Sequence, residues 1–230
     1  MEIEGTYHIL TAAHVWHKTS GAEQIVLPLS DYPSSFSIRR ENISAKELWF
    51  DNDNEWGPDL ALLRLARPFV STIEAHKSFL NLSRERATLA SCAPATAKGY
   101  WAVTGMVGEF NEVQPRPEAR SIEANIHARA FFSAIHQTHE RNGYDFLDAS
   151  ANLKLPGVPS SFGGVSGGGL WEVGLSMTKS GNISWDGRRH FRGVAFWQLA
   201  DADGRQVIRC HGPRSIFEKA WESWGLPQDG

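Results

Sequence analysis

Residues 191–210 read FRGVAFWQLADADGRQVIRC, and this stretch decides the fold class of the chain. Two runs rich in apolar and β-branched residues, 191–199 and 205–210, flank the short segment DADG at 201–204. Aspartate and glycine in such a segment are typical of the turn in a β-hairpin. The stretch therefore predicts two antiparallel strands connected by a tight turn.

Strand-like segments recur along the rest of the chain at short intervals. Apolar alternation or β-branched and aromatic enrichment predicts further strands at 6–16 (running into a short turn), 24–29, 46–50, 59–66, 99–107 and 170–176. A period of two also favours a strand or hairpin over residues 122–134, although the many alanines leave a helix open. One face of that segment carries Ile122, Ala124, Ile126, Ala128, Ala130, Phe132 and Ala134.

Only the segment after Pro213 predicts a firm helix. Its apolar residues fall on one helical face, and Gly225 with Pro227 supplies a stop signal. These apolar residues are Ile216, Phe217, Ala220, Trp221 and Trp224. Many short strands with glycine-rich turns and one helix predict an all-β barrel or sandwich.

Composition narrows the functional classes. The chain has 230 residues, and 41% of them are apolar, which suffices for a folded core. Its net charge is −3, so it lacks the excess of basic residues that is typical of proteins that bind nucleic acid or an anionic membrane. No apolar run reaches the 18 or so residues that a membrane span needs. Cys92 and Cys210 are expected as free thiols, and the first residues carry no signal-peptide pattern, so a cytoplasmic location is expected.

Three segments carry residues with chemical potential. They are TAAH at 11–14, DLALL at 59–63 and GGVSGGG at 163–169. A serine hydroxyl needs a neighbouring base to act as a nucleophile, imidazole suits that task near neutral pH, and a buried carboxylate fixes the imidazole tautomer. Glycines around Ser166 permit a tight turn that aims main-chain N–H groups at one point.

These three segments, in this order, resemble the trypsin-like (chymotrypsin-fold) serine peptidases. The resemblance implies that His14 is the base, Asp59 orients it and Ser166 is the nucleophile, while the amides of Gly164 and Ser166 form the oxyanion hole. It implies a protein or peptide substrate and neither a cofactor nor a metal. Val165 and Val15 replace residues that secreted members use for activation and for a disulfide, and they look like those of intracellular bacterial relatives.

The substrate side of the resemblance departs from the family pattern. Residues 193–197 resemble the strand that binds the substrate main chain, but this chain continues with Phe196, Trp197 and Gln198 where the family usually has Ser, Trp and Gly. A bulky Gln198 argues against a deep specificity pocket. Ser160 resembles the residue at the base of that pocket, and because it is uncharged it predicts no preference for Lys or Arg.

By this resemblance the fold is all-β, with two six-stranded antiparallel β-barrels and a C-terminal α-helix. The predicted halves are residues 1–88, with His14 and Asp59, and residues 89–230, with Ser166, joined through a linker at 84–98. Only 13 residues precede His14, so the first barrel is expected to be N-terminally incomplete. Its open edge predicts poor solubility, unless a missing strand or a partner chain completes the barrel.

Several alternatives compete with this interpretation. A nucleophile elbow of α/β-hydrolases would use Ser166, Asp201 and His211, but no apolar strand precedes Ser166. The acidic segment 51–58 lacks the glycine and glutamate of a calcium loop. His136 and His139 have metal-like spacing without a third ligand, which favours a solvated loop, and surface salt bridges are favoured for Arg209 and Arg214. A non-catalytic peptide-binding module remains open beside the peptidase.

Overall fold

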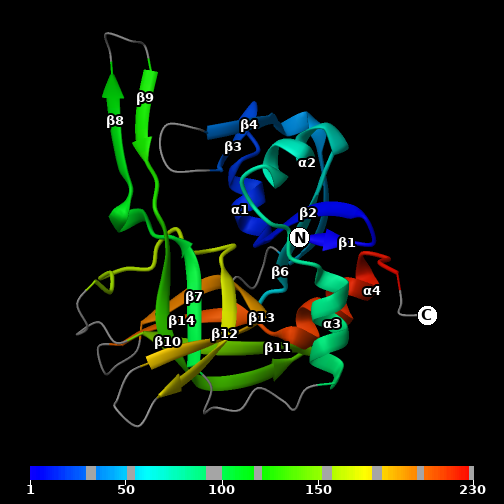
Figure 1. Cartoon of the computed structure of the whole chain (residues 1–230), viewed down its shortest axis with the longest axis vertical. Helices are drawn as coiled ribbons and strands as arrows, with labels where there is room; N and C mark the ends of the chain where they lie inside the picture. The colour runs from blue at the N-terminus through cyan, green and yellow to red at the C-terminus, as the bar shows by residue number, and fades with distance from the viewer. Residues whose placement is uncertain are drawn as a thin grey trace.

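The computed structural model describes residues 1–29, 35–50, 55–91, 100–116, 121–151, 157–177, 183–200 and 205–227. Strands account for 51% of the chain, so the all-β prediction is confirmed at the level of class. Figure 1 shows the N-terminal half lying against one end of a β-barrel that the later strands form. No helix in these described ranges has the length and apolar character that would be needed to cross a membrane.

The C-terminal half is a closed antiparallel barrel of six strands, in the order β10-β11-β14-β13-β12-β7. The strands are β7 (Tyr100–Met106), β10 (Ala128–Arg141), β11 (Tyr144–Ala151), β12 (Gly169–Met177), β13 (Ile183–Ala200) and β14 (Gln206–His211). Their inward side chains, among them Trp101, Val103, Leu170 and Ile208, pack into one apolar core. The hairpin predicted from residues 191–210 is confirmed by the pairing of β13 with β14, although its turn lies outside the described residues.

The N-terminal half contains two separate sheets. A four-stranded sheet has the order β1-β2-β6-β5, and β3 pairs with β4 alone. The strands are β1 (Glu2–Ile3), β2 (Thr6–Thr11), β3 (Gln24–Pro28), β4 (Ser35–Arg39), β5 (Ile43–Trp49) and β6 (Asp59–Leu65). The described residues close only one barrel, so the prediction of two barrels is confirmed for the C-terminal half alone.

The outer edge of β2 is partly covered. β1 pairs with Thr6 and Tyr7, and the main chain of Glu2 donates to the carbonyl of Leu80. A two-residue strand is too short to continue along β2 to Thr11. The idea that a further strand or a partner chain completes this edge stays a prediction.

One predicted strand is shorter than expected, and part of the predicted linker is helical. The strand predicted over 6–16 ends at Thr11 and gives way to helix α1 (Ala13–Lys18), whose Ala13 and Trp16 are buried. The predicted linker begins with helix α3 (Leu82–Ser91), because Leu82 packs into an apolar cluster and the Asn81 side chain accepts the N–H of Arg84 at the helix start. Residues 92–98 of that linker lie outside the described part, and the boundary between the halves stays a prediction.

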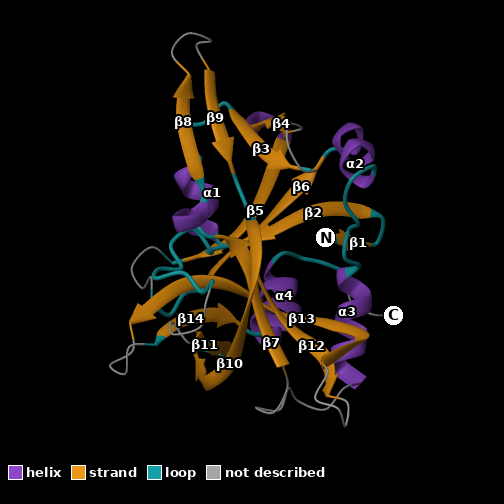
Figure 2. Ribbon diagram, turned by 60° about the vertical axis from the view of Figure 1, so that its left-hand side comes forward, coloured by secondary structure: helices purple, strands orange, loops and turns teal. Residues whose placement is uncertain are grey.

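The remaining elements lie around these sheets. They are η1 (Arg40–Asn42), α2 (Arg67–Glu74), η2 (Gly108–Phe110), β8 (Glu112–Arg116), β9 (Ser121–Asn125), the π-type helix η4 (Ser215–Ala220) and α4 (Trp221–Ser223). The last two confirm the predicted C-terminal helix. Figure 2 shows α3 beside it, where Arg86 donates to the carbonyl of Phe217 and lies over the ring of Trp221.

The segment 122–134 is a strand, as β9 and β10 show, and not a helix. On β10 the side chain of Phe131 is buried in the core, and Ile135 packs against the same core. Phe132, from the alanine-rich face, is exposed over 65% of its surface. The β8–β9 hairpin projects away from the barrel (Figure 1).

Candidate active site

Asp59 contacts His14 twice at the junction of β6 and α1. One carboxylate oxygen accepts the main-chain N–H of His14 at 2.8 Å, and the other lies 2.5 Å from the ring nitrogen Nδ1. Asp59 is buried, whereas the side chain of His14 is 21% exposed. An ionised carboxylate can only accept, so Nδ1 carries the proton and Nε2 keeps a free lone pair. Nε2 of His14 can therefore act as a base toward a group placed beside it.

The glycine-rich segment around Ser166 leaves two main-chain amides free. From Ser160 to Gly169 every N–H donates to an acceptor within the described residues except those of Gly164 and Ser166. Gly164 has a positive φ of 94°, and a Cβ atom there would lie 2.7 Å from the Met106 carbonyl oxygen. Glycine is thus required at this turn. The two free amides are the ones predicted to form an oxyanion hole.

Neighbouring amides hold this segment against strand β13. Gly167 donates to the carbonyl of Ala195 at 2.7 Å, and Ala195 donates to the carbonyl of Gly168 at 2.8 Å. A Cβ atom at Gly168 would lie 1.9 Å from the carbonyl oxygen of Thr104, so the segment also lies directly on β7. Two glycines therefore allow the Ser166 turn to sit between two strands of the barrel.

The Ser166 segment also contacts the segment that leads into His14. The backbone of Gly167 lies against Thr11 and the amide nitrogen of Ala12. The Ser166 hydroxyl itself donates to the carbonyl of Phe196 at 3.3 Å. Within the described residues no hydrogen bond joins Ser166 to His14. Such bonds are often long before substrate binds.

Three of the predicted substrate-binding residues line a small cavity beside Ser166. Phe196 is buried, whereas Trp197 is 36% exposed. Gln198 closes the cavity, because its side-chain oxygen accepts the N–H of Phe162 and its amide donates to Gln206. The cavity measures about 10 Å³, which is near the lower limit for a single water molecule.

The fourth predicted residue, Ser160, does not line this cavity. It is exposed, and its hydroxyl and its N–H both donate to the carboxylate of Glu109. These bonds lower the pKa of Glu109. Ser160 therefore ties the segment before Ser166 to η2.

Two buried cross-links that the sequence did not indicate hold the segment before Asp59. Arg209 donates to both carboxylate oxygens of Asp148. On its other side it donates to the main-chain carbonyl and the carboxylate of Glu55. Its guanidinium also lies 3.7 Å from the ring centre of Trp56. His211 accepts the N–H of Asp59 at 3.0 Å. Strand β14 thus carries both residues, Arg209 reaching Glu55 and His211 reaching Asp59. The surface role predicted for Arg209 was wrong, because its side chain is only 4% exposed.

Alternative assignments find less support in the described residues. His211 contacts Asp59 and shows no bond to Ser166, and Asp201 lies outside the described part of the chain. His139 stands in β10, not in a solvated loop, and pairs with Asp148 at 2.8 Å. Arg214 does form the predicted surface ion pair, with Glu140. No cluster of three or more metal-ligating side chains occurs within the described ranges. Cys210 is a free, buried thiol whose pKa is raised by burial, and Cys92 is not described.

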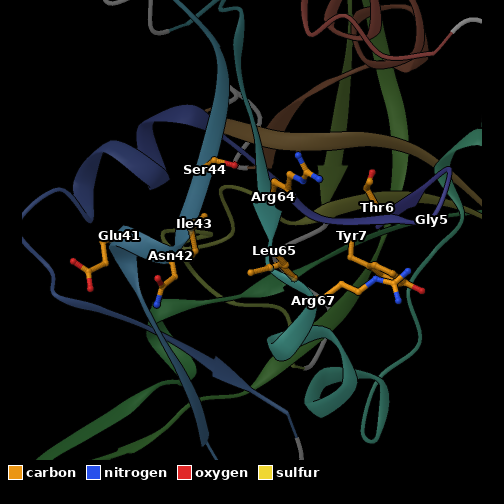
Figure 3. A pocket seen from close by; sticks show the side chains of 11 residues that line it. Gly5, Thr6, Tyr7, Glu41, Asn42, Ile43, Ser44, Arg64, Leu65 and Arg67 are labelled. Carbon is orange, nitrogen blue, oxygen red and sulfur yellow. The ribbon is translucent and has the colours of Figure 1, made fainter.

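A larger pocket lies at the far end of the N-terminal sheet (Figure 3). Its volume is about 590 Å³, and Arg64 and Arg67 lie at its wall with Thr6, Tyr7 and Ser44. Arg64 stands five residues after Asp59 on β6, which places it roughly 17 Å along the strand from the acid. The pocket is therefore separate from the cluster of His14, Asp59 and Ser166.

Comparison with known proteins adds no assignment. No model of a known protein family matches the sequence, and no curated protein matches it either.

Proposed function

We propose that the protein is a trypsin-like serine endopeptidase that cleaves peptide bonds through an acyl-enzyme. The observation that carries the proposal is the double contact of buried Asp59 with His14, which holds the ring with Nε2 free. The two free amides at Gly164 and Ser166 support it, because donors of this kind stabilise the negative oxygen that forms during acyl transfer.

In the proposed mechanism His14 Nε2 takes the proton of the Ser166 hydroxyl as the oxygen attacks the scissile carbonyl. Asp59 stabilises the resulting imidazolium, and the free amides bind the oxyanion. His14 then gives the proton to the leaving amine. Water attacks the acyl-enzyme by the same route, which releases the acid and restores Ser166. For these steps to occur, the Ser166 hydroxyl must leave the carbonyl of Phe196 and turn toward His14.

A fluorophosphonate probe tests the nucleophile directly. The wild-type protein should be labelled at Ser166, as peptide mass mapping would show, and Ser166→Ala should abolish labelling. Ser160→Ala is the matched control, because Ser160 lies in the same segment and bonds only to Glu109. Labelling that persists in Ser166→Ala would refute the assignment.

A non-catalytic peptide-binding module is the second candidate. Two observations favour it, namely the donation of the Ser166 hydroxyl to Phe196 and the closure of the neighbouring cavity by Gln198. This candidate predicts that the folded protein binds peptides without cleaving them. Cleavage of casein that is lost in His14→Ala would exclude it. A folded wild-type protein that neither reacts with the probe nor cleaves casein would favour it over the peptidase.

A further inference from the structure

His211 is a completely buried histidine at the end of β14. Its ring stacks on Phe196 with 4.2 Å between the ring centres, and Phe146 lies on it at 5.3 Å. Burial lowers the pKa of His211 to about 3. The ring is therefore neutral near pH 7 and carries a single proton on one of its two nitrogens.

The hydrogen bonds identify which nitrogen carries that proton. The main-chain N–H of Asp59 can only donate, so Nε2 of His211 is the acceptor and the proton sits on Nδ1. Nδ1 is buried and has no partner within the described residues. A buried donor without an acceptor is unfavourable, and a phenylalanine would fill the same space between Phe146 and Phe196 without that penalty. What a histidine adds here is the acceptor at Nε2.

Within its own sheet Asp59 pairs with Trp49 of β5, and on its other side it has no strand partner among the described residues. Strand β2 ends at Thr11, which pairs with Ala61, so β2 does not extend to Asp59. The segment just before Asp59 fits closely around the imidazole, because a Cβ atom at Gly57 would lie 2.8 Å from Cε1 of His211. The ring therefore occupies the place at which a neighbouring strand would otherwise have continued.

The same strand pair also holds the Ser166 segment. His211 pairs with Val194 on β13, and the next residue, Ala195, bonds Gly167 and Gly168. A short path of hydrogen-bonded backbone thus connects the amide of Asp59 to the turn that carries Ser166. We propose that His211 is a positioning residue, which sets Asp59, and through it His14, relative to Ser166. The catalytic part of this inference rests on the proposed peptidase function, whereas the positioning of Asp59 does not.

The first test uses the ¹⁵N-labelled wild-type protein. An N–H···N hydrogen bond gives a scalar coupling between its two nitrogens, so a coupling between the Asp59 amide and His211 Nε2 is expected at pH 7. The chemical shift of Nε2 should be that of an unprotonated nitrogen. A protonated Nε2, or the absence of the coupling in a well-resolved spectrum, would overturn the proposal.

Two variants test the consequence for the site. His211→Phe keeps the ring but removes the acceptor, and His211→Gln keeps an acceptor at a similar distance from the main chain. In His211→Phe the downfield proton signal of His14 Nδ1–H should weaken or shift, and labelling of Ser166 should slow on the order of 10–100-fold. In His211→Gln both should return most of the way to wild type. His8→Phe is the control, because His8 is also buried and its Nδ1 has no partner in the described part of the chain, but it belongs to the other end of the sheet.

The outcomes separate this inference from the proposed function. An unchanged His14 signal and labelling rate in folded His211→Phe would overturn the positioning role. If the wild-type protein is not labelled at all, the peptidase proposal fails. The scalar coupling between Asp59 and His211, together with the His14 proton signal, still decides the role of His211. If His211→Phe does not fold, the coupling in wild type and the recovery in His211→Gln decide it.

Discussion

Gly167 lies so close to Thr11 that a methyl group on its α-carbon would sit 2.2 Å from the threonine Oγ1. Gly167→Ala must therefore push the Ser166 segment away from the segment that leads into His14, and it also strains a backbone with φ of 85°. A shift of about 1 Å between reacting groups costs on the order of 100-fold in rate. We expect fluorophosphonate labelling of Ser166 to fall by about that factor.

Gly187→Ala is the matched control for this substitution. Gly187 has the same φ of 85°, but a Cβ atom there would meet nothing within 4 Å. It shares the backbone strain without the clash, so its labelling rate should stay near wild type. Equal losses in the two variants would mean that backbone strain, and not the contact with Thr11, is responsible.

Asp59→Asn should nearly abolish turnover while leaving the fold in place. An amide can present its N–H₂ to His14 Nδ1, which places the ring proton on Nε2, where the base is needed. In serine enzymes with such a triad this substitution lowers kcat by about 10⁴-fold. Kinetics on a peptide substrate measure it. Adding His14→Ala to Asp59→Asn should cost no more than His14→Ala alone, since the residues act as a unit, and additive losses would contradict the shared role.

Gln198→Ala should widen the range of substrates that the protein accepts. Gln198 closes the cavity beside Ser166, so wild type is expected to prefer small side chains next to the cleaved bond. Each methylene that a pocket can accommodate is worth roughly 10–200-fold in discrimination. A panel of peptides with Gly, Ala, Val and Leu at that position should show kcat/KM shifting toward the larger residues. Gln206→Ala, which removes only the second partner of Gln198, should retain the wild-type preference.

Stability should decrease as the pH falls below about 6.5. Burial lowers the pKa of His211 to about 3 and that of His8 to about 4, so between these values and 6.5 the unfolded chain binds protons that the folded protein does not. Each histidine then lowers the free energy of unfolding by up to about 1.4 kcal/mol per pH unit. Urea denaturation from pH 7.5 to 4.5 measures this slope.

The histidine variants identify the source of that pH dependence. His211→Gln and His8→Phe should each reduce the pH dependence of the free energy of unfolding by the equivalent of up to one bound proton. The double variant should reduce it further. The full contribution of both histidines is present above pH 6.5, so the variants should not alter the pH dependence there. A slope between pH 4.5 and 6.5 that neither substitution changes would assign it to other groups.

Most strands of the barrel could be predicted because their segments are rich in β-branched and aromatic residues. Strand β11 was missed, and its side chains do not alternate regularly between core and solvent. The same local pattern says nothing about whether an edge strand finds a partner. In the described residues the N-terminal half forms two separate sheets, and the barrel predicted there is not confirmed. His14, Asp59 and Ser166 were found by short motifs. His211 and Arg209 were not, because their importance comes from contacts across 152 and 154 residues of chain, which leave no pattern in sequence.

The bond between Asp59 and His211 also bears on how the chain is made. His14 and Asp59 leave the ribosome early, but the residue that holds Asp59 follows 152 residues later, after about 8–30 s of synthesis. The Ser166 turn waits as well, since β13 must be complete before Ala195 can bond it. If the proposed site is correct, the growing chain carries His14 and Asp59 long before the Ser166 turn can form beside them, and we expect the site to assemble late in folding.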